Sequence, residues 1–200
     1  MVAPKKREEI HPSSIIHHVT KKPIEFNVIF YIVKLVLFIQ LMNVNKFVFV
    51  DESGLNREYR RVYARAKRGV KVYDKTKGKR CKRTNIIGGL VYGEKAERHI
   101  AVQDYEHSTT SAFFEDWFEY ELIPMLPPSA LIIMDNASFH RKQILYDIAA
   151  RHGVFLLFLP PYSPNFNPIE HSWANFKYWL RSNSWRFPSF HFAIESYFYP

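Results

Sequence analysis

The chain has 200 residues, of which 47% are hydrophobic and 24% are charged, and its formal net charge is +9 at neutral pH. This composition excludes an intrinsically disordered chain and allows one domain with a substantial core plus an arm. A single cysteine, Cys81, excludes an internal disulfide and is typical of a reducing compartment.

The first 45 residues are expected to form a poorly defined N-terminal arm in which no DNA-reading domain is recognisable. The most distinctive part of this arm is an apolar run from Asn27 to Met42, which Lys34 interrupts. The run is too short to span a membrane comfortably, so we expect no membrane partner. We expect instead a buried helix or strand that packs on a main domain at residues 46–185. Residues 186–200 are expected to form a C-terminal tail.

Three apolar runs without polar alternation predict strands that are covered on both faces of a sheet. These runs are Lys46–Glu52, Ala130–Met134 and Val154–Leu159. Asp51 closes the first run and Asp135 follows the second. Because ligands gather beyond the carboxyl ends of strands in α/β sheets, both aspartates are candidate site residues.

Further strands are predicted at Asn85–Tyr92 and His99–Gln103. Residues Ser108–Ile123 show the period of an amphipathic helix, with aromatic side chains facing the core and acidic side chains such as Glu115 facing water. A second helix is predicted from a cap at Ser138 to about residue 152. The alternation of strands and helices in this half of the chain indicates parallel pairing with right-handed crossovers.

The positive charge is concentrated between residues 57 and 83, which contain thirteen Lys and Arg residues but only two acids. A basic segment on an otherwise nearly neutral chain indicates a polyanionic partner, nucleic acid first. A simple solvated face is the alternative interpretation. We predict DNA contacts from Arg68, Lys71, Lys77, Lys79, Arg80, Lys82, Arg83 and, farther along the chain, Lys177.

A proline-rich loop after Leu159 leads into a helix that carries one acid, Glu170, in its first turn. Asn167 is a good helix cap, and Pro168 suits the first helical position because its missing N–H is not needed there. An apolar stripe of helical period follows, formed by Ile169, Trp173, Phe176 and Leu180.

Asp51, Asp135 and Glu170 are therefore expected to meet at one edge of the sheet. Three converging acids repel one another, and a divalent cation resolves this conflict. All-oxygen ligands suit Mg²⁺ or Mn²⁺, and two such ions can activate a water and stabilise a leaving oxygen in an attack on phosphorus. The residue types alone thus predict nuclease-type phosphoryl transfer.

Three motifs also resemble a known family. The segments Val-Phe-Val-Asp51-Glu-Ser-Gly, Ile-Ile-Met-Asp135-Asn-Ala-Ser-Phe-His140 and Tyr162-Ser-Pro-Asn-Phe-Asn-Pro-Ile-Glu170-His-Ser-Trp173 are similar to the catalytic motifs of the DDE transposases. Thirty-four residues separate Asp135 from Glu170, a spacing used by the bacterial insertion-sequence branch of the mariner superfamily.

The resemblance implies an RNase H-like α/β fold, with a mixed central sheet and helices on both faces. It implies Asp51, Asp135 and Glu170 as catalytic, metal-binding residues for two Mg²⁺ ions, with Mn²⁺ as a substitute. It also implies cleavage at transposon ends and strand transfer into target DNA, by a homodimer in the bacterial cytoplasm, associated with the nucleoid.

The N-terminal arm does not resemble the helix-turn-helix region that such transposases carry. This difference suggests a truncated reading frame and DNA binding that is nearly blind to sequence, because sequence is read by base contacts. Two functions stay open at this point: an active recombinase core, and a non-catalytic DNA-binding remnant of a transposase. An unrelated metal nuclease on the same fold is a third interpretation.

Overall fold

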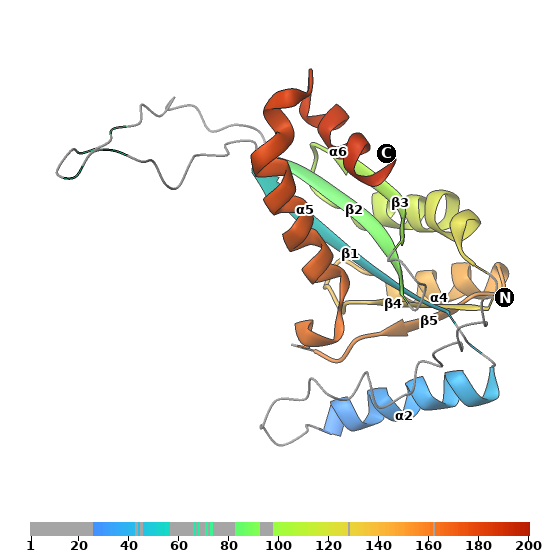
Figure 1. Ribbon diagram of the computed structural model, residues 1–200. Coiled ribbons are helices and arrows are strands. Elements are labelled where there is room, and N and C mark those ends of the chain that lie inside the picture. Colours follow the sequence, from blue (N-terminus) through green and yellow to red (C-terminus); the bar gives the residue numbers. More distant parts are fainter. Residues whose placement is uncertain are drawn as a thin grey trace, which may run out of the picture.

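The structure, a computed structural model, describes residues 26–42, 44, 46–56, 66, 68, 71, 73, 83–92, 98–127, 129–161 and 163–200. In these parts of the chain, five strands form one mixed sheet in the order β3-β2-β1-β4-β5. The strands are β1 (Lys46–Asn56), β2 (Arg83–Tyr92), β3 (Arg98–Tyr105), β4 (Ala130–Met134) and β5 (Phe155–Phe158). Because β1 pairs antiparallel with β2 and parallel with β4, the two kinds of pairing meet at this central strand (Figure 1).

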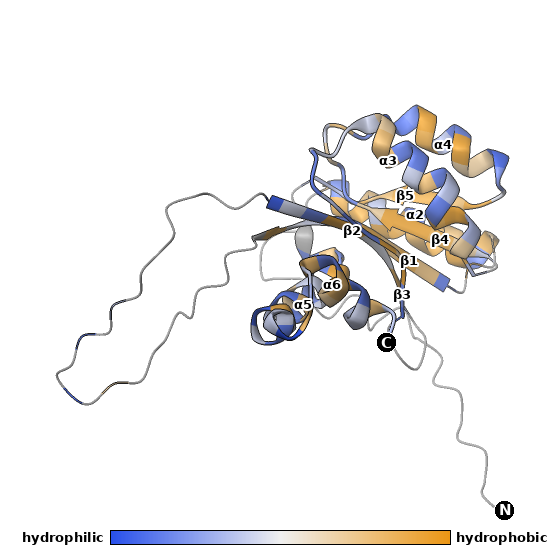
Figure 2. Ribbon diagram, turned by 90° about the horizontal axis from the view of Figure 1, so that it is seen from above, coloured by the Kyte–Doolittle hydropathy of each residue, from blue (hydrophilic) through white to orange (hydrophobic). Residues whose placement is uncertain are grey.

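Helices cover both faces of the sheet, as predicted (Figure 2). One face carries α3 (Ser111–Trp117), its π-helical continuation η1 (Phe118–Leu122), the 3₁₀ turn η2 (Ile123–Met125) and α4 (Lys142–Arg151). The other face carries α2 (Phe26–Leu41), α5 (Ile169–Asn183) and α6 (Phe190–Phe198).

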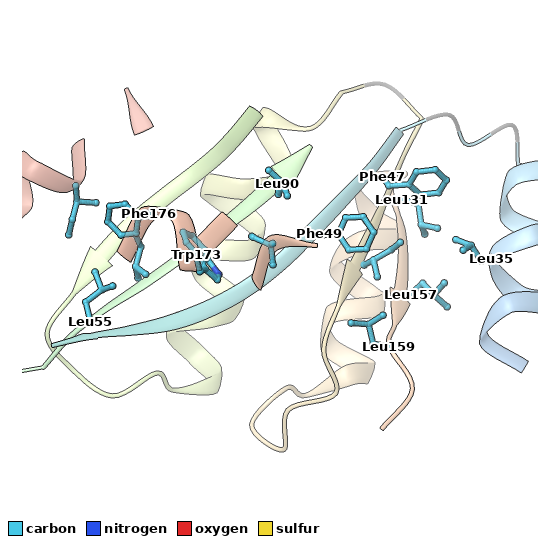
Figure 3. Packing of buried hydrophobic residues seen from close by; sticks show 14 of the residues in the cluster. Leu35, Phe47, Phe49, Leu55, Leu90, Leu131, Leu157, Leu159, Trp173 and Phe176 are labelled. Carbon is cyan, nitrogen blue, oxygen red and sulfur yellow. The ribbon is translucent and has the colours of Figure 1, made fainter. Parts of the chain in front are cut away.

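The alternation of side chains along β1 divides the core into two layers. Phe47 and Phe49 face the side on which Trp173 and Phe176 of α5 are packed (Figure 3). The intervening residues, such as Val48, face the aromatic side chains of α3 and η1. Each layer is built from large apolar side chains, which explains why the β1 sequence lacks polar alternation.

The apolar run in the N-terminal arm forms helix α2, beside the edge strand β5 (Figure 1). Tyr31 and Leu35 are buried, and Phe38 contacts the ring of Phe155 with a centroid separation of 5.6 Å. The opposite side of α2, including Phe30, is exposed, so only one stripe of the helix packs on the domain. Among the described helices, none combines the length and apolar character required to cross a membrane.

Two details of the helices differ from the predictions. Glu115 was expected to face water, but it is buried because Arg141 forms a two-pronged ion pair with its carboxylate. Ser138 does not cap α4, which begins only at Lys142 and has no side-chain cap. The intervening residues form a turn, closed by a hydrogen bond of 3.1 Å from the His140 N–H to the Ala137 carbonyl.

The region predicted to be a C-terminal tail contains a packed helix. The Ser189 hydroxyl caps α6 by accepting a hydrogen bond of 3.2 Å from the Phe192 N–H. Ala193 and Ile194 are buried in the same layer as α5. After the helix, the Tyr199 hydroxyl contacts both backbone groups of Val102 on β3, at 3.0 Å from the nitrogen and 3.4 Å from the oxygen.

Substitution of Gly89 by Ala is expected to destabilise the fold by about 1–3 kcal/mol, because strand β2 is overpacked by any side chain at this position. A Cβ atom there would lie 3.0 Å from Leu122, 3.1 Å from Ile100 and 3.2 Å from Val48. Urea unfolding monitored by circular dichroism measures this loss.

Gly54→Ala provides a matched control on the neighbouring strand β1. The three atoms nearest to the new Cβ all belong to the guanidinium group of Arg83, which can swing aside because it is the end of a flexible side chain. We expect a change within about 0.5 kcal/mol. Equal losses in the two variants would contradict the packing described for β2.

Candidate active site

Three carboxylates from separate parts of the chain line one pocket of about 370 Å³. Asp51 lies on β1, Asp135 directly follows β4, and Glu170 is the second residue of α5. Val50 is paired with Met134 in the parallel register of β1 and β4, so the two aspartates follow aligned residues. The structure thus brings the three predicted acids together at one edge of the sheet.

The loop after β5 forms much of the pocket wall. The Leu159 N–H donates a hydrogen bond of 2.8 Å to the Met134 carbonyl, which holds the start of this loop against the end of β4. The prolines that follow exclude regular pairing and direct the chain around the pocket toward α5. The lining residues other than the acids are Asn136, Ala137, Leu159, Pro160, Pro161, Ser163 and Asn167.

Asn167 has a different role from the one predicted. Helix α5 begins at Ile169, and the Asn167 side chain does not cap it. Instead, the Asn167 backbone carbonyl accepts a hydrogen bond of 3.2 Å from the Glu170 N–H. The side chain is buried in the pocket wall, and its Oδ1 atom has no hydrogen-bond partner among the described residues. The pocket wall thus contains a buried amide oxygen whose hydrogen-bonding capacity is not used within the described residues.

Asp51 lies in surroundings that oppose its negative charge. Burial raises its pKa most, and repulsion from Asp135 and Glu170 raises it further, to about 7. The Glu52 backbone N–H and the Trp173 indole act in the opposite direction. Because the buried Trp173 Nε1 has no partner in normal hydrogen-bond geometry, we interpret its effect on Asp51 as that of a nearby dipole.

A second group of potential metal-binding side chains lies toward the opposite face of β1 and was not predicted from the sequence. Potential ligand atoms of Glu52, Asp135 and His140 all lie within 4.8 Å of one another. His140 Nε2 lies 3.2 Å from Asp135 Oδ1, and the Ala137 N–H donates to the same oxygen at 3.1 Å. Burial acts against the ionised form of Asp135, but these two contacts outweigh it and lower its pKa.

Glu52 and His140 could have been found from the sequence only in part. Strand alternation places Glu52 on the face opposite Asp51, where burial first and then the two aspartates raise its pKa to about 8. His140 stands five residues after Asp135, and its buried ring packs against Phe114 and Phe139 at centroid separations of 4.3 and 4.2 Å. The sequence gives no direct signal for this packing.

The donor set of the pocket fits a hard divalent cation. The carboxylate oxygen atoms of Asp51, Asp135 and Glu170 are ligands that Mg²⁺ and Mn²⁺ prefer. Such a cation would also balance the repulsion that raises the pKa of Asp51.

The structure places some of the predicted DNA contacts. Arg83 opens β2, and its guanidinium group lies across Gly54 of β1. Lys177 is half-buried on α5, close enough to Asp51 for the carboxylate to raise its pKa, although burial lowers that pKa overall. Arg68 and Lys71 are exposed to solvent. The remaining predicted contacts lie outside the described residues: Lys77, Lys79, Arg80 and Lys82.

Comparisons with known proteins connect this geometry to a family. Residues 46–190 match the protein family described as DDE superfamily endonuclease. A comparison with curated proteins found no match.

The fold is similar to solved structures of the Mos1 transposase. The paired-end complex with the left transposon end matches with a TM-score of 0.59 at 14% identity over 90% of this chain. The strand transfer complex matches with a TM-score of 0.57 at 14% identity over 98% of this chain. The mariner paired end complex with Mn matches with a TM-score of 0.54 at 15% identity over 88% of this chain. The chain spans 53%, 56% and 53% of these three proteins, about half their length. This likeness confirms the RNase H-like fold.

Asp51→Asn is expected to stabilise the metal-free protein at pH 8, on the order of 1–3 kcal/mol. The folded-state pKa of Asp51 is raised to about 7, so the ionised carboxylate destabilises the fold. This cost appears as the pH rises from about 4, the unfolded-state pKa, to the folded-state pKa, and it is absent below that window. Urea unfolding in EDTA at pH 4 and pH 8 measures the difference.

The stabilising effect of Asp51→Asn should nearly disappear at pH 4, where the wild-type carboxylate is protonated in the folded state and already about half protonated in the unfolded state. Added Mg²⁺ should stabilise the wild type more than the variant, since the variant has lost one anionic oxygen donor. A variant that is less stable than the wild type at pH 8 in EDTA would show that Asp51 is not held under electrostatic strain.

Proposed function

Because the chain belongs to the DDE superfamily endonucleases, we propose that it is the catalytic core of a transposase, which cleaves DNA strands and transfers the freed 3′-hydroxyl into a target. The observation that carries this proposal is that Asp51, Asp135 and Glu170 line one and the same pocket. The three acids come from β1, the end of β4 and α5, so the fold itself assembles the site.

We assign Asp51, Asp135 and Glu170 as the residues that hold two Mg²⁺ ions, with Mn²⁺ as a substitute. Bound ions of this kind activate the attacking oxygen and stabilise the leaving oxygen in phosphoryl transfer. The oxygen-only donor set of the pocket supports this assignment, and related Mos1 paired-end complexes have been solved with Mg and with Mn.

The surrounding residues hold the three acids in place before any ligand arrives. Asp51 is fixed within β1, where it pairs with Gly88 of β2 and directly follows Val50, the last residue paired with β4. Asp135 has one oxygen held by His140 and Ala137, which leaves the other oxygen available to a ligand. Glu170 lies in the first turn of α5, where the helix dipole favours a charged carboxylate. Such preorganisation is what a catalytic constellation requires.

DNA is the proposed partner, both as transposon ends and as target. The basic residues near the pocket, Arg83 and Lys177, support this assignment because they can neutralise phosphates beside the acids. The Mos1 paired-end complexes support an assembly that holds two ends, and we propose a homodimer in the active complex. An insertion-sequence origin and a cytoplasmic, nucleoid-associated location complete the proposal.

A non-catalytic DNA-binding remnant is the alternative. The pocket argues against this alternative. Its three acids repel one another, and a remnant that is no longer selected for catalysis has no need to keep them together. Metal-dependent nicking of DNA separates the two functions directly.

Asp135→Asn and Glu170→Gln are each expected to reduce Mg²⁺-dependent nicking of a supercoiled plasmid by at least about a hundredfold, because each removes an anionic ligand. Agarose gel electrophoresis of relaxed product against time measures the rate. The matched control is Asp147→Asn, an exposed acid on α4 that contacts Gln143 at 2.9 Å and should leave the rate unchanged. Nicking that continues at the wild-type rate in both acid variants, or in EDTA, would refute the assigned site.

Neutralising five cations of the basic segment is expected to weaken DNA binding equally for all sequences. The slope of log Kd against log salt should fall by about one unit for each phosphate that the protein no longer neutralises. Fluorescence anisotropy with a labelled duplex at four salt concentrations measures this slope. An unchanged slope would place the DNA path elsewhere. The substituted residues are Lys77, Lys79, Arg80, Lys82 and Arg83.

A further inference from the structure

A basic and aromatic surface follows the outer side of α5, starting from the pocket. Lys177 and Arg181 come seven and eleven residues after Glu170. At 3.6 residues per turn, both lie within about 20° of the line that Glu170 marks along the helix, about 10 and 16 Å away. The apolar stripe occupies the buried side of the helix; Arg181 is exposed, and Lys177 is half-buried at the margin of this stripe. We call this the α5 surface; it comprises Arg83, Lys177, Tyr178, Arg181, Trp185 and Arg186.

The cations of the α5 surface act on one another and on the pocket. The pKa of Lys177 is lowered overall, mainly by burial. The Asp51 carboxylate acts in the opposite direction, and the guanidinium groups of Arg181 and Arg83 lower the pKa further. Arg83 comes from β2 and the other two from α5, so the cluster is formed by the fold rather than by a local run of sequence. Three cations that repel one another beside an acidic pocket form a binding site for the phosphates on either side of a reacting phosphate.

Two large aromatic side chains belong to the same surface, Tyr178 between the cations of α5 and Trp185 after them. Tyr178 is 74% exposed and Trp185 is 76% exposed. The Trp185 indole N–H donates a hydrogen bond of 2.9 Å to the Ser182 carbonyl, and the Arg186 guanidinium lies over the ring at 5.2 Å from its centroid. These contacts hold the indole at the protein surface, with most of it open to solvent. Its orientation is therefore set before any partner binds.

We propose that the α5 surface binds the DNA strand whose phosphate enters the pocket, and that Trp185 stacks on an unpaired base of that strand. This inference rests on the proposed function and deepens it. Phosphates account for the cations, and an exposed, oriented indole beside them is the platform on which a base stacks in single-stranded nucleic-acid sites. A base in an intact duplex has both faces covered by its neighbours, so the platform selects an unpaired one.

The position of the platform also fits a flexible strand. Trp185 lies in the 3₁₀ turn η4 (Ser184–Arg186), directly after the C-terminal end of α5, and that end is about 20 Å from Glu170 along the helix. A strand that leaves the pocket along Lys177 and Arg181 reaches Trp185 several nucleotides from the reacting phosphate. The α5 surface therefore matches a duplex end with a single-stranded extension better than it matches a blunt end.

The test compares two DNA probes in EDTA, a blunt duplex and the same duplex with a five-thymidine extension. The full chain should bind the extended probe more tightly, and Trp185→Ala should lose about tenfold in affinity for it, the range expected for one stacked base. Affinity of Trp185→Ala for the blunt probe should be unchanged. Trp185→Phe keeps a stacking ring and should restore most of the preference.

Tyr120→Ala is the matched control for Trp185→Ala. Tyr120 is 68% exposed, lies in η1 on the opposite face of the sheet, and should have no effect on either probe. The inference is overturned if the wild type shows no preference for the extension, or if Trp185→Ala retains it. It is also overturned if Trp185→Ala weakens both probes equally, because the indole then contacts paired DNA.

The cations are tested separately through salt dependence. Lys177→Gln and Arg181→Gln should each lower the slope of log Kd against log salt by about one unit on the extended probe. Lys34→Gln, an exposed cation on α2, should leave the slope unchanged. Unchanged slopes in the two α5 variants would remove this surface from the DNA path.

These binding measurements distinguish failure of the inference from failure of the proposed function. They are made without metal, so they do not depend on cleavage. A chain that shows the Trp185-dependent preference but never nicks DNA would keep the surface and lose the proposed activity. A chain that nicks DNA without this preference would lose only the surface.

Discussion

The parallel pairing of β1 with β4 is the constraint on which the site depends. It places Asp51 and Asp135 directly after two aligned residues, Val50 and Met134, so the aspartates lie beside each other, one on β1 and one at the end of β4. A shift of one residue in this register would turn one aspartate to the opposite face, because side chains alternate along a strand. Strand β4 is apolar and buried at every position, which suits its place between the two core layers.

The same arrangement makes the site unfavourable for the stability of the metal-free fold. Asp51 and Glu52 are neighbours on one strand, and burial raises the pKa of both. The packing on both faces of β1 offsets this loss of stability, since a layer rich in aromatic side chains covers each face. A protein that keeps acids in such a place uses part of its packing energy to maintain a functional site.

The main elements could be predicted from the sequence because their signals are local. Strand β4 has the predicted bounds, and the helix that carries Glu170 lies where its apolar stripe indicated. The gathering of the three acids was expected from the ends of two apolar runs and one helix start, although β1 continues past Asp51 to Asn56. The family motifs added the identity of the acids but no information about their neighbours.

The features that the sequence did not reveal depend on contacts between distant residues. Glu115 is buried only because Arg141, twenty-six residues later, pairs with it. His140 reaches Asp135 only because an irregular turn replaces the start of α4 that a Ser138 cap would have produced. The C-terminal helix α6 was missed because its aromatic residues face several partners, which obscures the helical period.

The contact between Tyr199 and Val102 has a consequence for the behaviour of the protein in solution. Strand β3 is an edge of the sheet, and the free backbone groups of an edge strand are templates on which other chains can pair. The Tyr199 hydroxyl occupies both backbone groups of Val102, and α6 covers the sheet beside them. Loosening of α6 would uncover this edge while β1 and β4 still hold Asp51 and Asp135 side by side. The helix that carries Glu170 would lose the packing of Phe198 on Trp173 and Phe176. We therefore expect the last helix both to protect this edge from pairing with other chains and to support the helix that carries Glu170.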